Sequence, residues 1–281
     1  MKNALSVDVE DWFQVGAFET VIDRASWDRI PRRVERNTDN VLALFEEAGV
    51  KATFFTLGWV AERHSALIRR ISEAGHEVAS HGWDHRRVFT LSEAEFRADI
   101  GKARQAIEDA AGVAVTGYRA PSFSIDPRTP WAHQVLAEQG YAYSSSVAPV
   151  AHDHYGWREA PRFAWRPIGG ADLIELPVTT LDLAGRRVAA GGGGFFRILP
   201  YAFSSWAVGQ VNRREARPAI FYFHPWEIDP GQPRVAEASI KSKLRHYTNL
   251  EGMRPKLLKL LRAHDWGRTD EVAATEAARL Q

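Results

Sequence analysis

The chain has 281 residues, of which 45% are hydrophobic and 25% charged, as is ordinary for a globular protein. Its 36 Lys and Arg residues nearly balance 35 Asp and Glu residues, and the net charge of +1 argues against non-specific nucleic-acid binding, which needs a concentrated positive field. The sequence contains no cysteine, so disulfides and cysteine-based zinc sites are excluded, and any metal must be held by His and carboxylate side chains.

The N-terminal stretch predicts neither a secretory signal nor a membrane span. Its first apolar run, residues 4–9, is interrupted by Asp8. A secretory signal needs an apolar core of about 7–15 residues and a membrane span about 20. We therefore expect a protein of the cytoplasm without a transmembrane segment.

Strands and helices alternate along the first half of the chain. Apolar and β-branched runs predict the strands, and periodic apolar positions that end at a glycine predict the helices. The spacing of Ser92 and Glu95 is that of a capping box, which opens one of these helices. The expected strands are residues 4–9, 50–56, 76–80 and 113–118, and the expected helices are residues 38–48, 64–74, 92–112 and 130–139. This alternation is typical of parallel βαβ units, in either a barrel or an open doubly wound sheet.

The pattern is looser in the second half. Predicted in order are a long loop over residues 148–170, strands over 173–180 and 219–223, a helix over 256–262 and a surface tail after Gly267. The glycine run 191–194 predicts either a flexible turn or a substrate-covering loop. Because neither an internal repeat nor a linker is evident, we expect one domain over residues 1–281, with a C-terminal extension from about residue 235.

Acids and histidines follow two of the predicted strands. Asp8 and Glu10 are two residues apart, so in extended chain their side chains point the same way. Acids at this place could also cap a helix. His81 and His85 follow the strand 76–80, and four-residue spacing would put both rings on one face of a helical turn, within reach of one ion. An isolated pair of this kind is more often accidental, but its place beside a strand end favours metal ligation.

Two further polar residues follow predicted strands. Arg119 comes after the strand 113–118, where a guanidinium could hold a carboxylate through paired hydrogen bonds, although a surface arginine before a turn is the commoner case. His224 comes after the strand 219–223, in a position suited to a general acid or base. The alternative is a half-buried histidine satisfied by the backbone.

At this point the chain resembles the polysaccharide deacetylases, the NodB-homology group of carbohydrate esterases. The resemblance extends over about residues 4–235 and rests on five motifs in the family's order: DVED (8–11), ATFF (52–55), GHEVASHGWDH (75–85), GYRAPSFS (117–124) and FYFHPWE (221–227). The set looks closest to the subgroup encoded with exosortase-linked exopolysaccharide loci. The resemblance implies an α/β fold, a distorted (β/α)7-type barrel with about seven parallel strands. It also implies removal of acetyl groups from an N-acetylated polysaccharide, an exopolysaccharide or its precursor.

The resemblance also implies a divalent metal, usually Zn²⁺, held by one acid and two histidines. His81 and His85 match the metal histidines of the family. Most members have two adjacent aspartates at the acidic motif, whereas this chain has Asp8, Val9, Glu10 and Asp11. Because Asp8 and Glu10 share a face, we expect Glu10 to be the metal acid, with Asp11 as the alternative.

The catalytic residues are carried over in the same way. Asp8 matches the catalytic base, Arg119 matches the arginine that orients this base, and His224 matches the general acid. Backbone N–H groups near residues 121–123 are expected to stabilise the oxyanion. The expected substrate-binding residues are Trp83, Pro121, Ser122 and Trp226.

One position departs from the family pattern. Ser144 stands where relatives of the subgroup usually have an aspartate before paired serines. If that aspartate helps to position a catalytic histidine, Asp153 or Asp182 could replace it here.

Two other functions remain open. The same motif set supports hydrolysis of a small cyclic amide or imide, and the Ser144 departure leaves room for an inactive glycan-binding protein. The expected cytoplasmic location conflicts with the fact that polymers of this kind are usually modified outside the cytoplasm. A substrate in the form of a lipid-linked precursor would reconcile the two, because the protein would then act at the inner face of the membrane.

Overall fold

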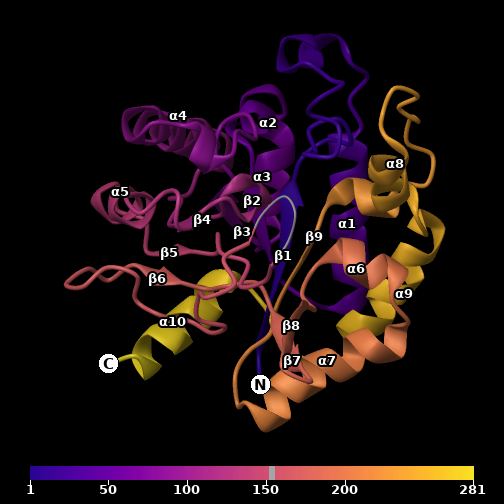
Figure 1. The fold of residues 1–281 in the computed structure, drawn as a ribbon. Helices are drawn as coiled ribbons and strands as arrows, with labels where there is room; N and C mark the ends of the chain where they lie inside the picture. Colours follow the sequence, from indigo (N-terminus) through magenta and orange to yellow (C-terminus); the bar gives the residue numbers. More distant parts are fainter. Residues whose placement is uncertain (152–155) are drawn as a thin grey trace.

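In a computed structural model that describes residues 1–151 and 156–281, a parallel sheet is built around the first strand of the chain (Figure 1). This strand, β1 (Asn3–Val9), is buried along its whole length, as expected of a strand covered on both faces. It pairs in parallel with β9 (Ile220–Phe223) on one side and with β2 (Thr53–Thr56) on the other. Both chain termini lie at the lower end in Figure 1, opposite the carboxyl end of β1.

The sheet has eight strands, in the order β10-β1-β2-β3-β4-β5-β6 with β9 paired to β1. Its remaining strands are short: β3 (Glu77–Ser80), β4 (Gly117–Tyr118), β5 (Tyr143–Ser144), β6 (Ile174–Glu175) and β10 (Trp266–Gly267). Every pair in it is parallel. Strand β10 meets only the first residues of β1, below the point at which β2 begins. The expected distorted barrel is therefore confirmed.

Helices cover the outside of the curved sheet (Figure 1). They are α1 (Val34–Ala48), α2 (Gly58–Arg63), α3 (Ser65–Glu73), α4 (Glu93–Ala111), α5 (Ala132–Glu138), α6 (Gly193–Ile198), α7 (Tyr201–Arg214), α8 (Ile240–Tyr247), α9 (Leu250–Ala263) and α10 (Thr269–Arg279). Short 3-10 helices are η1 (Arg24–Arg29), η2 (Val88–Thr90), η3 (Pro121–Phe123) and η4 (Pro225–Ile228). The capping box of Ser92 and Glu95 begins α4, and Gly112 in the left-handed conformation ends it, as the sequence predicts.

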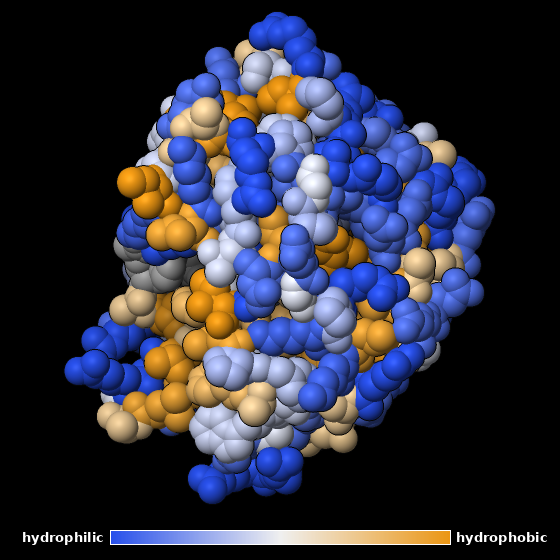
Figure 2. Space-filling model, turned by 90° about the vertical axis from the view of Figure 1, so that its right-hand side faces the viewer, coloured by the Kyte–Doolittle hydropathy of each residue, from blue (hydrophilic) through white to orange (hydrophobic). Residues whose placement is uncertain are grey.

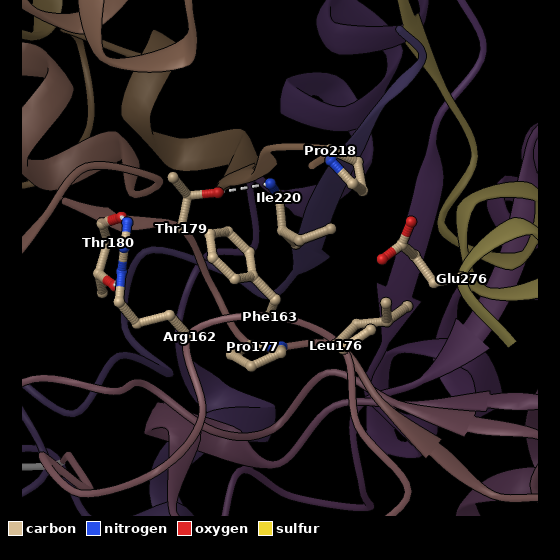
Figure 3. A pocket seen from close by; sticks show the side chains of 10 residues that line it. Arg162, Phe163, Leu176, Pro177, Thr179, Thr180, Pro218, Ile220 and Glu276 are labelled. Atoms are coloured by element: carbon tan, nitrogen blue, oxygen red, sulfur yellow. Dashed lines mark hydrogen bonds between the residues drawn. The ribbon is translucent and has the colours of Figure 1, made fainter. Parts of the chain in front are cut away.

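The barrel is not closed by a regular ladder between β6 and β9. Single hydrogen bonds bridge the gap, among them those of Thr179, whose N–H donates to the Ile220 carbonyl and whose hydroxyl accepts the Ile220 N–H (Figure 3). A cavity of about 10 Å³ remains beside this junction, lined in part by Leu176, Pro177, Pro218 and Glu276. It can hold about one water molecule and is too small for a sugar.

Several elements of the second half differ from expectation. The strand predicted over residues 173–180 divides into β6 and the first strand of an antiparallel hairpin, β7 (Thr180–Leu183) and β8 (Arg186–Ala189). The predicted surface tail is wrong, because residues after Gly267 form α10. Ala273 of α10 packs with Phe55 and Tyr143 at the amino end of the barrel, so α10 covers that end. An alanine-rich helix can bury such a narrow apolar stripe although it looks like a tail in sequence.

The glycine run 191–194 is neither a flexible turn nor a covering loop. Gly192 bridges to Tyr222 of β9, and Gly193 begins α6. A Cβ on Gly191 would overlap the Ile220 carbonyl, and a Cβ on Gly193 would overlap the Glu227 carboxylate. These glycines therefore permit close packing.

The face formed by the C-terminal helices is mostly hydrophilic, with apolar side chains in separate patches (Figure 2). The large exposed apolar residues of α6, α7 and α8 are Phe195, Ile198, Trp206, Ile240 and Leu244. Within the described residues, no helix combines the length and the apolar character that a bilayer crossing requires.

Candidate active site

Polar side chains from four strand ends meet at the carboxyl end of the barrel. Glu10 follows β1, His81 follows β3, Arg119 follows β4 and His224 follows β9. The carboxyl ends of parallel strands lie at one edge of a sheet, and in barrels this edge carries the active site. The structure brings these four residues and Asp8 together.

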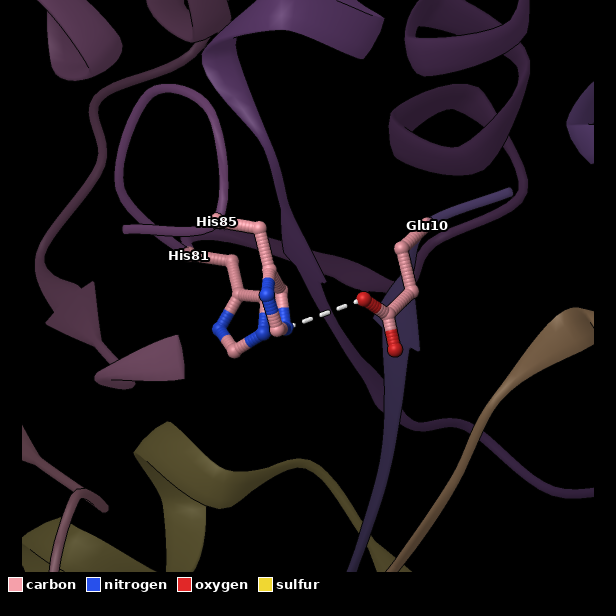
Figure 4. A group of neighbouring side chains, drawn as sticks. All are labelled: Glu10, His81 and His85. Atoms are coloured by element: carbon pink, nitrogen blue, oxygen red, sulfur yellow. Dashed lines mark ion pairs between the residues drawn. The ribbon is translucent and has the colours of Figure 1, made fainter. Parts of the chain in front are cut away.

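Three of these side chains form a cluster that could hold a metal ion. Glu10, His81 and His85 each offer one ligand atom within 4.8 Å of the others, and all three are buried (Figure 4). The two rings meet through a loop and not through the helical turn that the sequence predicts. Gly82 and His85 both adopt positive φ, 74° and 61°, which turns the chain back so that the ring centroids lie 5.6 Å apart.

The atoms of this cluster fit a divalent cation. His81 donates from Nδ1 to the Arg119 carbonyl at 2.9 Å, which leaves Nε2 with its lone pair toward the cluster. Glu10 Oε2 is buried and lies 3.1 Å from His85 Nε2, yet makes no hydrogen bond within the described part of the chain. Two imidazoles and a carboxylate are ligands that Zn²⁺ accepts.

The protonation states of the cluster agree with metal ligation. Burial lowers the pKa of His85 to about 4, so its ring is neutral at pH 7. Burial opposes the charge of Glu10, but the imidazoles of His85 and His224 outweigh it and lower its pKa to about 2. Metal ligands must be deprotonated, and these two residues meet that condition.

Asp11 has a different environment from Glu10. Its carboxylate accepts the backbone N–H groups of Trp12, Arg33 and Val34, at 2.8, 2.7 and 3.0 Å. Burial raises its pKa to about 6 against the effect of these hydrogen bonds. Since Val34 begins α1, Asp11 serves the amino end of that helix, and it is not a member of the cluster.

A buried ion pair joins Asp8 to Arg119. Arg119 Nη1 lies 2.7 Å from Asp8 Oδ1, and Arg119 has no exposed surface. Its other hydrogen bonds run to the hydroxyls of Ser6 and Ser145 and to the Ser145 carbonyl, and its guanidinium lies 4.1 Å from the centroid of the Phe55 ring. These contacts fix the orientation of the Asp8 carboxylate.

His224 lies close to three carboxylates. Its Nε2 is 3.0 Å from Glu10 Oε1 and 4.0 Å from Asp8 Oδ2, and its Nδ1 is 2.8 Å from Glu227 Oε1. Burial disfavours the imidazolium, but Glu10 and Glu227 outweigh this effect and raise its pKa to about 10. The side chain is 20% exposed, so part of this charged proton donor is accessible to solvent.

The two tryptophans expected to bind substrate differ in burial. Trp83 is partly buried: it packs against Gly58 of α2, and the Lys102 ammonium of α4 lies 3.3 Å from its ring centroid. Trp226 is 6% exposed and stacks against His224 and His246, with centroids 5.0 and 4.1 Å away. Trp226 is thus held mainly by packing against neighbouring rings, whereas Trp83 keeps part of its surface exposed in a cavity between α2 and α4. A role of either ring in binding a sugar stays a prediction.

Pro121 and Ser122 do lie at the barrel mouth, in η3 directly after Arg119 and Ala120. Ser122 and Phe123 both have positive φ, 55° and 49°. Two such residues in succession are rare outside glycine and often accompany functional sites.

The Ser144 position holds no carboxylate, and Asp182 does not take its place. Ser144 donates its hydroxyl to Ser146 at 2.8 Å. Asp182 lies in β7, where its half-exposed side chain pairs with Arg162 and Arg187. Asp153 lies outside the described residues.

Two residues of the site went unassigned in the sequence. Glu227 bonds to His224, and Arg197 pairs with Glu227 at 2.7 Å, both fully buried. The spacing of His224 and Glu227 is that of a capping box around Pro225, a signal that could have revealed Glu227. Arg197 follows the glycine run and carries no local signal of its own.

Comparison with known proteins agrees with this site. Residues 25–144 match the family model "Polysaccharide deacetylase", and residues 145–274 match "Domain of unknown function (DUF3473)". The chain is 31% identical over 107 residues to a peptidoglycan deacetylase of Helicobacter pylori, covering 38% of this chain and 36% of that protein. It is 32% identical over 141 residues to a chitooligosaccharide deacetylase of a Bradyrhizobium species, covering 50% of this chain and 58% of that protein. The chain thus spans less than two thirds of either relative.

A solved structure supports the fold. The crystal structure of a candidate polysaccharide deacetylase from Mycobacterium smegmatis superposes with a TM-score of 0.64 at 21% identity, covering 100% of this chain and 92% of that one. At this identity the likeness concerns the fold alone. The family match, the fold and the cluster at the strand ends agree with one another: over residues 25–144, the chain is similar to the polysaccharide deacetylase family.

Proposed function

We propose that the protein is a metal-dependent N-deacetylase that releases acetate from an N-acetylated polysaccharide. One observation carries the proposal. The metal-type cluster of Glu10, His81 and His85 lies beside both a fixed carboxylate, Asp8, and an imidazolium, His224. Hydrolysis of an acetamide needs these three functions, because the carbonyl is a poor electrophile, water is a weak nucleophile and an amine leaves only when protonated.

The ligands for the metal would be Glu10, His81 and His85, and a divalent ion bound there supplies Lewis acidity and lowers the pKa of water. Asp8 would remove a proton from the attacking water, since Arg119 holds its Oδ1 and leaves Oδ2 on the side of His224. Pro121 has no N–H, and the Phe123 N–H donates to the Ala120 carbonyl. The Ser122 N–H is therefore our candidate to stabilise the oxyanion.

His224 would complete the reaction as general acid. Its Nε2 proton passes to the nitrogen of the sugar as the C–N bond breaks, which frees the amine. The hydroxyl of the attacking water stays on the acetyl carbon, and the acetic acid so formed ionises to acetate. The proton that Asp8 took from the water returns to His224 Nε2, which restores both groups. Acid and base groups are each typically worth about 10²–10⁴-fold in rate.

The substrate class is drawn from the relatives and from the sequence motifs. Relatives named for peptidoglycan and chitooligosaccharide deacetylation support an N-acetylated glycan. The likeness to the exosortase-linked subgroup narrows our proposal to an exopolysaccharide or its lipid-linked precursor, with Zn²⁺ as the metal.

Acetate release from a hexamer of N-acetylglucosamine, with metal content measured on the same sample, tests the proposal. We expect turnover with zinc, and a loss of at least about 100-fold in the Asp8→Asn and His224→Ala variants while zinc binding is retained. Asp182→Asn, an exposed position outside the site, serves as the control. Turnover of cyclic ureides or imides in place of the hexamer would favour the amidohydrolase alternative. Hexamer binding without acetate release at saturating zinc would favour a glycan-binding protein.

A further inference from the structure

We propose that Glu227 positions the His224 ring for proton transfer, and that Arg197 and the C-terminal end of α8 hold Glu227 in place. This inference rests on the proposed function, because it concerns the same general acid. It also assigns a task to the region matched only as a domain of unknown function.

Glu227 fixes both the ring and the backbone of His224. Its Oε1 lies 2.8 Å from His224 Nδ1 and also accepts the His224 backbone N–H at 3.1 Å. With a proton held on Nδ1, the opposite nitrogen Nε2 points toward Glu10 and Asp8. One carboxylate therefore sets the direction in which the acid donates.

Glu227 itself has little freedom to move. It is 1% exposed, and its second oxygen pairs with Arg197 Nε at 2.7 Å. The backbone of Gly193 lies so close that a Cβ there would overlap the carboxylate. The side chain is thus held between an arginine and a glycine that leaves just enough room for it.

Arg197 ties this carboxylate to the end of a helix. Its remaining N–H groups donate to the carbonyls of Arg245, His246 and Thr248, at 2.9, 2.9 and 2.6 Å. The first two carbonyls lie in the last turn of α8 and the third is that of its C-cap residue, where the helix dipole places partial negative charge. A buried guanidinium that serves three carbonyls and one carboxylate is fixed in both position and plane.

Aromatic stacking restricts the His224 ring from a second direction. Trp226 stacks against His224 at an interplanar angle of 20°, and His246 stacks against Trp226 at 14°. His246 also bonds through Nε2 to Gln232. The α8 end therefore supports the acid through both Arg197 and His246.

The assembly divides the site between an N-terminal part of the chain and the region matched over residues 145–274. Its members Gly193, Arg197, His224, Glu227 and the α8 carbonyls all lie within residues 145–274. The metal-type cluster and Asp8 lie before residue 86. The C-terminal region thus supplies and orients the acid, and Glu227 fills the role left without a carboxylate at Ser144.

Two substrates with different leaving groups distinguish a loss of positioning of His224 from general damage to the active site. An amine must be protonated to depart, whereas 4-nitrophenolate departs without a proton. In Glu227→Gln we expect kcat on the N-acetylglucosamine hexamer to fall by about 10–100-fold with KM changed by less than about 3-fold, while hydrolysis of 4-nitrophenyl acetate falls by less than about 3-fold. Glu227→Asp should recover part of the loss, and Arg197→Met should repeat the Gln pattern. Equal losses on both substrates, or no loss on the hexamer, would overturn the proposal.

The matched control is Glu276→Gln, because Glu276 is also a buried glutamate paired with an arginine, Arg217, but lies in α10. It should leave the ratio of the two activities unchanged. A wild-type protein that is inactive on every acetylated glycan would refute the proposed function. The positioning of His224 by Glu227 would then be tested by crystal structures of wild type and Glu227→Ala. We expect the His224 ring to move in the variant, and a ring that stays within about 0.5 Å of its wild-type position contradicts the proposal.

Discussion

Arg119 is the residue on which the Asp8 carboxylate depends. Both side chains are buried, and the pair is 2.7 Å apart with no exposed surface on Arg119. A buried pair adds little compared with apolar residues, yet removing one partner leaves an uncompensated charge in the interior. The role of Arg119 in stability is therefore measurable apart from any role in catalysis.

We expect Arg119→Met to lower the free energy of unfolding by about 3–5 kcal/mol, because it strands the Asp8 carboxylate. Urea denaturation followed by circular dichroism measures this difference. Arg97→Met is the control, since Arg97 pairs with Glu138 at the surface and such pairs contribute little. A similarly small decrease in the free energy of unfolding of both variants would show that the buried charge of Asp8 does not need Arg119 to compensate it.

At the scale of single residues, the sequence was enough to identify most residues of the site but not the contacts that they make. The placing of Asp8 near the end of a predicted strand, and of the other four site residues just after predicted strands, was enough to expect them at one edge, because parallel strands bring those ends together. It favoured Glu10 over Asp11 because Asp8 and Glu10 share a face, but it could not assign Asp11 its own contacts, since these depend on where the amino end of α1 lies. It could not find Arg197, whose partners are carbonyls 48–51 residues away in sequence.

At the scale of elements, α10 docks on the barrel through a partly buried acid. Glu77, the first residue of β3, accepts the Tyr143 hydroxyl at 2.8 Å and the Asp270 N–H of α10 at 3.1 Å. Burial, together with the charge of Asp270, raises the pKa of Glu77 to about 7. The folded state therefore favours the protonated form more than the unfolded chain does.

This shift predicts a pH dependence of stability. A folded pKa above the model value of 4.5 gives a contribution that is fully present below about pH 4.5 and is lost as the pH rises through about 7. Glutamine cannot ionise, so Glu77→Gln should not show this loss. Between pH 5 and pH 8 the free energy of unfolding of the variant should therefore rise relative to that of wild type, by at most about 3 kcal/mol. Unfolding free energies across this range test it, with the exposed Glu73→Gln as control. Parallel curves for wild type and Glu77→Gln would refute the assignment.

Elements with a clear apolar face could be predicted, and those without one could not. The run at α4 has a capping box, a buried stripe and a terminal glycine, and its bounds agree with expectation. Helix α8 exposes Ile240 and Leu244 among basic residues, so no buried face marks it in sequence. Strands β4, β5 and β6 have two residues each, too few for any periodicity.

At the scale of the whole molecule, both matched regions build one sheet and one site. Strand β1 is paired with β2 from the first part of the chain and with β9 and β10 from the last. The cluster adds another link, because Glu10 follows β1 whereas His81 and His85 follow β3, two strands away. An ion bound there would tie these non-adjacent loops together, and its binding energy would add to the stability of the fold.

Zinc should therefore raise the unfolding temperature, and a chelator should reverse the effect. Free zinc at 100 times its dissociation constant adds about 2.7 kcal/mol, which corresponds to a shift of about 5 °C for a chain of this size. Glu10→Gln should abolish the shift because it removes a ligand. Asp11→Asn should unfold at a lower temperature than wild type, since it weakens the amino end of α1, yet keep the full zinc shift. Differential scanning calorimetry with and without zinc measures both variants. A shift retained by Glu10→Gln and lost by Asp11→Asn would move the metal to Asp11 and with it the whole assignment of the site.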